Sequence, residues 1–91
     1  MPSELDDLSE KGVQGAIELL AAVRETREEY HACTAGELSR RMRMAKSTVV
    51  HRLGQLRERG LVEWSDLPGG IHLTLRGGRV LSHALRSTRD N

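Results

Sequence analysis

The sequence predicts a mainly helical domain with one small β-hairpin, in the α+β class. Three segments carry apolar side chains at intervals of three and four residues, the spacing of one helix face. Two short segments near residue 65 alternate apolar and polar side chains as strands do, and a Pro-Gly-Gly turn separates them. The 91 residues are enough for one domain with a core, which we expect over residues 8–89 after a flexible N-terminus, residues 1–7.

The first helix is predicted over residues 8–29. Asp7 and Glu10 have the spacing of a capping box, in which the two side chains bind backbone N–H groups at a helix start. Its apolar face is predicted to contain Val13, Ile17, Leu20 and Val23. Residues 30–33 are then expected to form a short strand.

A second capping box opens a short helix that ends near residue 42, because Glu37 follows Thr34 by three residues. After a turn, a longer helix is predicted over residues 45–59. The side chains expected to face the core are Val49, Leu53 and Leu56. The opposite face carries hydrogen-bonding side chains: Ser47, Thr48, His51, Arg52 and Gln55. Gly60 stands where a left-handed residue commonly ends a helix.

The remaining third of the chain is predicted to form the hairpin and a last helix. The two strands are expected at residues 61–65 and 71–75, joined by a loop over residues 66–70. The last helix is expected over residues 76–89. The complete order is therefore helix, strand, helix, helix, strand, strand, helix.

The net charge of +1 is unevenly distributed. Residues 1–33 hold eight acidic and three basic side chains, a net charge of −5, whereas residues 34–60 hold two acidic and seven basic ones, a net charge of +5. Residues 61–91 hold three acidic and four basic side chains. The basic middle third favours an anionic partner, and a merely solvated arginine-rich surface is the alternative.

The order of elements is that of a winged helix-turn-helix domain. Residues 37–62, ELSRRMRMAKSTVVHRLGQLRERGLV, resemble without a gap the widespread pattern ELAxxLxxSxxTVxxxLxxLxxxGLV. The following LTLRG at residues 73–77 is similar to the LTxxG of MarR-like and DtxR-like bacterial regulators. The resemblance implies a prokaryotic, sequence-specific regulator of transcription, expected to be a repressor, that binds double-stranded DNA with the helix over residues 45–59 in the major groove.

The resemblance also implies roles for individual residues. The side chains expected to contact base edges are Ser47, Thr48, His51, Arg52 and Gln55. Those expected to contact phosphates are Arg40, Arg41, Arg43, Lys46, Arg76 and Arg79.

The chain departs from the pattern at three places. Arg43 replaces the usual turn glycine, and Ala45 replaces the usual serine cap, so we expect the start of the following helix to be held weakly. The hairpin loop, residues 66–70, has no arginine or lysine. We therefore expect it to contribute little in the minor groove.

Several other functions were weighed against DNA binding. His31 and Cys33 suggest a metal- or redox-responsive regulator, but no CxxC or HxxxH spacing completes a metal site, so we expect no metal and no cofactor. A winged-helix protein-interaction module is the other alternative. The sequence contains no recognisable pairing of a nucleophile with a base and no paired carboxylates, so we do not expect an enzyme.

The cellular setting follows from composition. One cysteine and an acidic N-terminus without an apolar stretch favour the cytoplasm, and no segment is apolar enough for a membrane. Since one domain of this size contacts little sequence, we expect a homodimer on a palindromic site. The sequence identifies no small-molecule effector.

Overall fold

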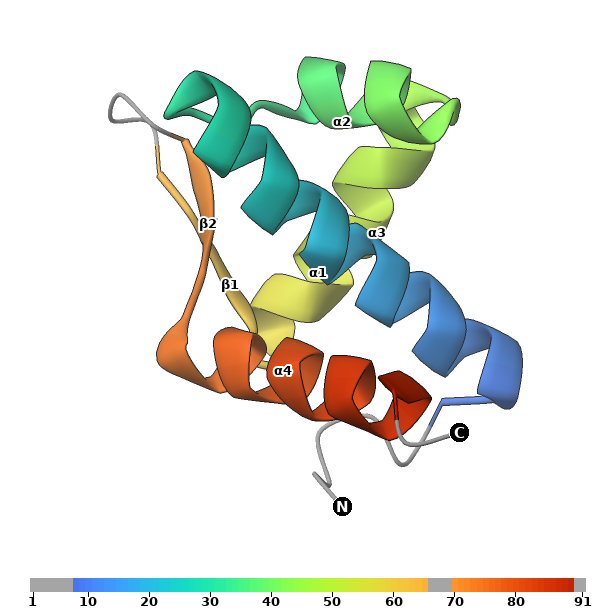
Figure 1. Cartoon of the computed structure of the whole chain (residues 1–91). Helices are drawn as coiled ribbons and strands as arrows, with labels where there is room; N and C mark the ends of the chain where they lie inside the picture. Colours follow the sequence, from blue (N-terminus) through green and yellow to red (C-terminus); the bar gives the residue numbers. More distant parts are fainter. Residues whose placement is uncertain (1–7, 66–69, 90–91) are drawn as a thin grey trace.

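The computed structural model of the chain describes residues 8–65 and 70–89 (Figure 1). The described elements are α1 (Glu10–Tyr30), α2 (Ala35–Met42), α3 (Lys46–Glu58), β1 (Val62–Trp64), β2 (Ile71–Leu73) and α4 (Leu75–Arg89). The mainly helical class and the small hairpin are therefore confirmed. The predicted flexible segment 1–7 and most of the predicted hairpin loop, residues 66–69, lie outside the described residues.

Helix α1 begins two residues later than predicted. The hydroxyl of Ser9, rather than a capping box of Asp7 and Glu10, caps the helix by accepting a hydrogen bond from the backbone nitrogen of Gly12, 3.1 Å away. Asp7 itself lies outside the described residues. At the other end the helix continues through Tyr30 and stops at His31, which has a left-handed φ of 59°.

The prediction of a strand at residues 30–33 is wrong. Because α1 includes Tyr30 and His31 is left-handed, too few extended residues remain before α2 for a strand. What remains is one parallel bridge between Cys33 and Gly70, with the backbone nitrogen of Ile71 donating to the oxygen of Cys33 at 3.0 Å. The described sheet therefore has two strands rather than three.

The turn between α2 and α3 forms as its residues require. Thr34 caps α2 as predicted, since its hydroxyl accepts from the backbone nitrogen of Glu37 at 3.2 Å. Arg43 then takes the left-handed conformation, with φ at 55°. Ser39 stabilises the turn through two hydrogen bonds to Met44. The Ser39 hydroxyl donates to the backbone carbonyl of Met44, and the backbone carbonyl of Ser39 accepts from the backbone N–H of Met44.

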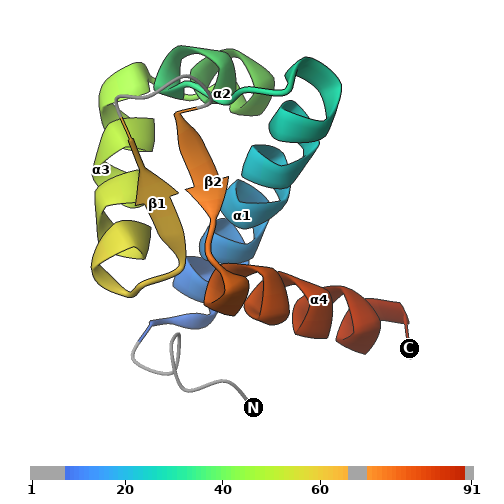
Figure 2. The same ribbon diagram turned by 90° about the vertical axis from the view of Figure 1, so that its left-hand side faces the viewer.

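Strands β1 and β2 pair in antiparallel fashion, with Val62 opposite Leu73 and Trp64 opposite Ile71. Between these pairs Glu63 and His72 face each other, and His72 Nε2 lies 2.9 Å from Glu63 Oε2. The hairpin lies between α3 and α1 in the view of Figure 2: β1 is next to α3 and β2 is next to α1. It occupies the position of the wing in a winged helix-turn-helix domain.

Every described helix and strand contributes to one hydrophobic core. Helix α1 contributes the buried side chains Ala16, Leu19, Leu20, Ala22 and Val23. Helices α2 and α3 contribute Ala35, Leu38, Val49, Leu53 and Leu56. The hairpin, α4 and the segments between the helices contribute Cys33, Leu61, Val62, Ile71, Val80 and Leu81. The inward stripe predicted for α3 is thus confirmed. On α1 the burial is shifted from the prediction, because Val13 and Ile17 are only partly buried.

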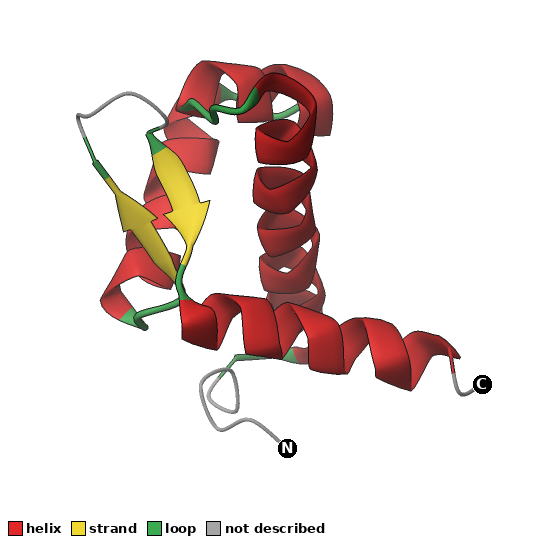
Figure 3. Ribbon diagram, turned by 60° about the vertical axis from the view of Figure 1, so that its left-hand side comes forward, coloured by secondary structure: helices red, strands yellow, loops and turns green. Residues whose placement is uncertain are grey.

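A single side chain joins the end of α3 to the start of α4. The hydroxyl of Thr74 donates to the oxygen of Gly60 at 2.6 Å and accepts from the nitrogen of Gly77 at 3.0 Å. A Cβ on Gly77 would stand 2.0 Å from the oxygen of Leu61, so only glycine permits this close approach. From this junction α4 runs across the molecule and its C-terminal half extends beyond the other helices (Figure 3).

Across the described parts of the chain, none of the helices has the length and apolar character needed to cross a membrane.

Candidate nucleic-acid interface

Helix α3 carries a buried side and an exposed side, as the sequence predicts. Leu53 is fully buried, whereas Ser47 and His51 are exposed on the opposite side. Gln55 is exposed one turn after His51, and Thr48 is half-buried. Figure 2 shows α3 at the edge of the molecule, so this side is open to a partner.

Arg52 is exposed but lies beside α1. Its Nη1 atom would be 3.3 Å from a Cβ placed on Gly15, which shows that the guanidinium lies along the N-terminal half of that helix. A cavity of about 270 Å³ separates the two helices here, and its lining includes Lys11, Gln55 and Arg59. Arg52 is therefore at the flank of the exposed surface rather than at its centre.

Three of the predicted phosphate-binding cations lie on the helix-turn-helix before or at the start of α3, and Arg40 also lines a cavity beside Thr26 and Tyr30 of α1. Arg40, Arg43 and Lys46 are all exposed, and they come from α2, the turn and the first residue of α3. Their positions follow directly from the short α2–α3 turn. Arg43 and Lys46 place positive charge at the end of α3 whose first backbone N–H groups are unbonded within the helix.

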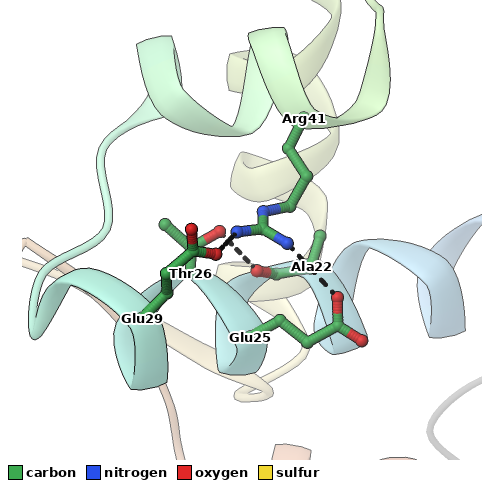
Figure 4. Close-up of polar contacts among 5 residues, drawn as sticks. All are labelled: Ala22, Glu25, Thr26, Glu29 and Arg41. Atoms are coloured by element: carbon green, nitrogen blue, oxygen red, sulfur yellow. Dashed lines mark hydrogen bonds and ion pairs between the residues drawn. The ribbon is translucent and has the colours of Figure 1, made fainter.

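Arg41 has a different environment, because α1 supplies it with two carboxylates (Figure 4). One guanidinium nitrogen is paired with Glu29 and the other lies 3.5 Å from Glu25 Oε2. The hydrogen bond from Arg41 lowers the pKa of Glu29 from its ordinary value. This group, which we call the Arg41 clamp, consists of Arg41, Glu25 and Glu29 and joins α2 to α1.

The clamp lies over a buried polar residue of α1. Thr26 is fully buried, and its hydroxyl donates to the oxygen of Ala22 at 2.7 Å (Figure 4). Its polar group is thereby satisfied within the helix. The charged pairs of the clamp are consequently the polar link between α1 and α2, and Thr26 is not part of that link.

Arg76 and Arg79 are exposed near the start of α4. The Nη1 atom of Arg76 would be 3.5 Å from a Cβ placed on Gly60, so this guanidinium lies near the end of α3. It also lines a shallow cavity beside the hairpin together with Arg57 and Trp64. Arg76 is thus at the base of the wing, and Arg79 is exposed one turn further along α4.

The start of α3 has the weak cap that the sequence predicts. Ala45 occupies the N-cap position and makes no side-chain hydrogen bond there. In α2 the same position is filled by Thr34, whose hydroxyl binds a backbone N–H. The first N–H groups of α3 are therefore open to an external acceptor such as a phosphate oxygen.

The two residues suggested for metal or redox chemistry, His31 and Cys33, differ in their exposure to solvent. Cys33 is fully buried and His31 is exposed at the end of α1. Burial raises the pKa of the Cys33 thiol to about 11, so the reactive thiolate is scarce at neutral pH. Within residues 8–65 and 70–89, no three side chains of the metal-binding types come together.

Two residues of the exposed side of α3 were missed by the sequence interpretation. Val50 is 38% exposed although its neighbour Val49 is buried. Gly54 lies one turn further on, and no atom stands within 4 Å of the position its Cβ would take. Helical spacing places Val50 at the edge of the buried stripe, about 60° from Leu53, and Gly54 about 100° from Leu53, so a full helical projection would have marked both as bordering the exposed side.

The fold and this surface together define the class of the protein. A helix-turn-helix, an antiparallel hairpin and a following helix, with several exposed cations on the helix-turn-helix, constitute a winged helix-turn-helix DNA-binding domain. Residues 12–66 match the family of the IclR helix-turn-helix domain, and the chain belongs to that family. It is accordingly a DNA-binding domain of the kind used in transcription regulation. The resemblance to MarR-like and DtxR-like regulators stays a prediction.

The solved structures give independent support for the fold. The crystal structure of the hypothetical protein SSo2273 from Sulfolobus solfataricus is similar, with a TM-score of 0.70 and 18% sequence identity. The similarity covers 77% of this chain and 53% of that chain, so this chain spans about half the length of its relative. At this identity the likeness concerns the fold alone. No curated protein matches the sequence.

Proposed function

We propose that this chain is a sequence-specific transcriptional repressor that competes for promoter DNA as a homodimer. The observation that carries the proposal is the exposed side of α3, where hydrogen-bonding side chains stand between cations in a helix-turn-helix of the IclR family. Its action is binding, and we expect no catalysis.

The dimensions of α3 suit a major groove. Its 13 residues make a helix of roughly 20 Å, and the groove admits one helix with its side chains. Ser47 and His51 are on the first two turns, which enter deepest in related domains. Gln55 would contact bases further along, and Thr48 and Arg52 would contact the groove from the α1 side.

Phosphates on either side of the groove would be bound by separate sets of cations. Arg40, Arg43 and Lys46 would hold one strand close to the uncapped start of α3, where backbone N–H groups add donors. Arg76 and Arg79 would reach a second strand from the base of the wing. Arg41 is expected to contribute less than these residues, since two carboxylates of α1 already neutralise it.

The homodimer is supported by the apolar surface of α4. Leu85 is 39% exposed and Ala84 is half-buried, both on the half of α4 that extends beyond the other helices (Figure 3). Pairing along this half would bury them and present two copies of α3 to successive half-sites.

Selection of bound duplexes from a random DNA library tests the proposal. We expect enrichment of a palindromic sequence whose affinity falls linearly with salt on logarithmic axes, with a slope of about −5 or steeper for a dimer. If no duplex binds even at low salt, DNA binding is excluded and a protein-interaction module becomes the better explanation. The metal- and redox-responsive alternatives are disfavoured by the burial and raised pKa of Cys33.

A further inference from the structure

Gly54 has no role in the fold that would explain a glycine there. It lies inside α3, where glycine lowers helix stability relative to alanine, and open space surrounds the position of a Cβ. Gly77 is the opposite case, since a Cβ there would meet the oxygen of Leu61. Packing therefore accounts for Gly77. Gly54 and Gly78 both lack a packing reason, but of the two only Gly54 lies on α3, the helix whose exposed side would face a partner.

Val50 is the exposed apolar side chain next to this glycine. Residues four apart are neighbours on a helix surface, so Val50 and Gly54 together form a shallow apolar patch on α3. At 38% exposure, Val50 leaves much of its surface to solvent. Beside it stand the polar Ser47 and His51, which limits the apolar surface to this one place.

We propose that Val50 contacts the C5-methyl group of a thymine in the major groove and that Gly54 lets α3 approach the groove closely enough for this contact. The inference rests on the proposed DNA-binding function and adds a base preference to it. In the major groove the thymine methyl is the apolar group that distinguishes one base pair from the others. A single methyl group is small enough to be covered by the patch that Val50 and Gly54 form.

A partner protein fits the same patch less well. A helix that docks on another helix needs an apolar stripe that recurs every three or four residues. On the exposed side of α3 the positions before and after the patch are Lys46 and Glu58, both charged. The patch is therefore too short for a second helix to dock on it, whereas the contact with one thymine methyl group needs only a patch of this size.

Uracil substitution removes the methyl group and changes nothing else in the base pair. In the duplex selected from the random library, each thymine is replaced in turn by deoxyuridine, and affinity is measured at fixed salt. We expect one thymine in each half-site at which the substitution weakens binding about fourfold, the equivalent of one methylene contact. In Val50→Ala this sensitivity should disappear. In Leu75→Ala, which truncates an exposed leucine of α4, it should persist.

Gly54→Ala tests the second half of the proposal. Because its Cβ would stand in open space, the substitution should raise the melting temperature by a few degrees while weakening the binding of every duplex. Gly78→Ala is the matched control, since Gly78 is also helical and its Cβ would also stand in open space. It should raise the melting temperature and leave affinity unchanged.

The failures of the two proposals can be told apart. If the library yields no bound duplex, the proposed function and this inference both fall. If a duplex is enriched but uracil has no effect at any position, or has the same effect in Val50→Ala, the thymine contact is wrong while DNA binding stands. If Gly54→Ala binds as tightly as the wild type, the close approach at Gly54 is wrong.

Discussion

At the residue scale, the start of α3 is stabilised less than an ordinary helix start. Ala45 provides no side-chain acceptor, and Arg43 holds a left-handed φ of 55° that a glycine would adopt at lower cost. The neighbouring helix α2 has Thr34 at the same N-cap position, and its hydroxyl accepts a backbone hydrogen bond. A phosphate bound at this end would supply the missing acceptor, so DNA is expected to stabilise the turn.

Ala45→Ser should restore the cap. The serine hydroxyl can accept from a backbone N–H of the first turn, which should raise the free energy of unfolding by roughly 1 kcal/mol. Urea denaturation followed by circular dichroism measures the change. Ala45→Val, which offers no acceptor, is the control and should give no gain. Equal stability of the serine and valine variants would show that α3 does not need this cap.

His51→Ala and Arg40→Ala should affect DNA binding in different ways. His51 is expected to contact bases, so its loss should change which duplexes are selected. Arg40 is expected to contact a phosphate, so its loss should weaken all duplexes alike and reduce the magnitude of the salt slope by about 1. Selection and salt titration of both variants provide the measurement. If both variants changed sequence preference equally, the assignment of the two sides would be wrong.

At the element scale, the Arg41 clamp fixes α2 against α1 and should make that contact sensitive to pH. The pKa of Glu29 is lowered in the folded state from 4.5, so the carboxylate contributes stability above about that pH. The contribution is lost as the pH falls through the lowered pKa, because the protonated acid no longer pairs with Arg41. Both partners are partly exposed, so the effect should be small and screened by salt.

Glu29→Gln should therefore lower the melting temperature slightly at neutral pH and have no effect well below pH 4.5. Melting curves of the variant and the wild type across this range give the comparison. Glu28→Gln removes an exposed carboxylate one residue earlier and serves as the control for net charge. A difference between Glu29→Gln and the wild type that stayed constant down to low pH would contradict the role of the ion pair.

Elements set by local chemistry could be predicted from the sequence, and contacts between distant residues could not. Thr34 and Glu37 mark the start of α2 within four residues, and the start and the Thr34 cap are confirmed. The other half of the capping box is not, because Glu37 Oε2 is buried without a hydrogen-bond partner among the described residues. The strand expected at residues 30–33 fails because α1 continues to Tyr30, and the sequence has no signal that ends it earlier. The clamp was missed because Arg41 is 12 and 16 residues from its two partners.

The same distinction applies to the candidate site. The inward stripe of α3 follows from helical periodicity, which is why Leu53 and its neighbours were placed correctly. Arg52 could not be placed, because its direction depends on the open surface of α1 beside Gly15. Val50 was missed since an apolar residue next to the stripe is normally assigned to the core.

At the scale of the whole molecule, α4 is the element expected to join two chains. A homodimer should sediment in analytical ultracentrifugation with about twice the monomer mass of 10.1 kDa at micromolar concentration. Leu85→Glu should shift the protein towards the monomer, because a charge would replace an apolar side chain at the proposed contact.

Leu75→Glu is the control, since Leu75 is 74% exposed at the opposite end of the same helix. It should leave the sedimentation coefficient unchanged. Should the wild type sediment as a monomer across this concentration range, the homodimer is excluded. DNA binding by one domain would then have to be weaker and less specific.

The hydrogen bonds of Thr74 would couple α4 to α3 in such a dimer. Its hydroxyl bonds to Gly60 and to Gly77, and its backbone nitrogen donates to the oxygen of Leu61, so the residues just after α3 and the first turn of α4 are joined at Thr74. A rotation of α4 about a partner would therefore act on the residues after α3 through Thr74, as well as on the core through Val80 and Leu81. Anything that tilts the two copies of α4 against each other would change the distance between the two DNA-binding helices, and so would switch the domain between geometries that do and do not fit the same operator.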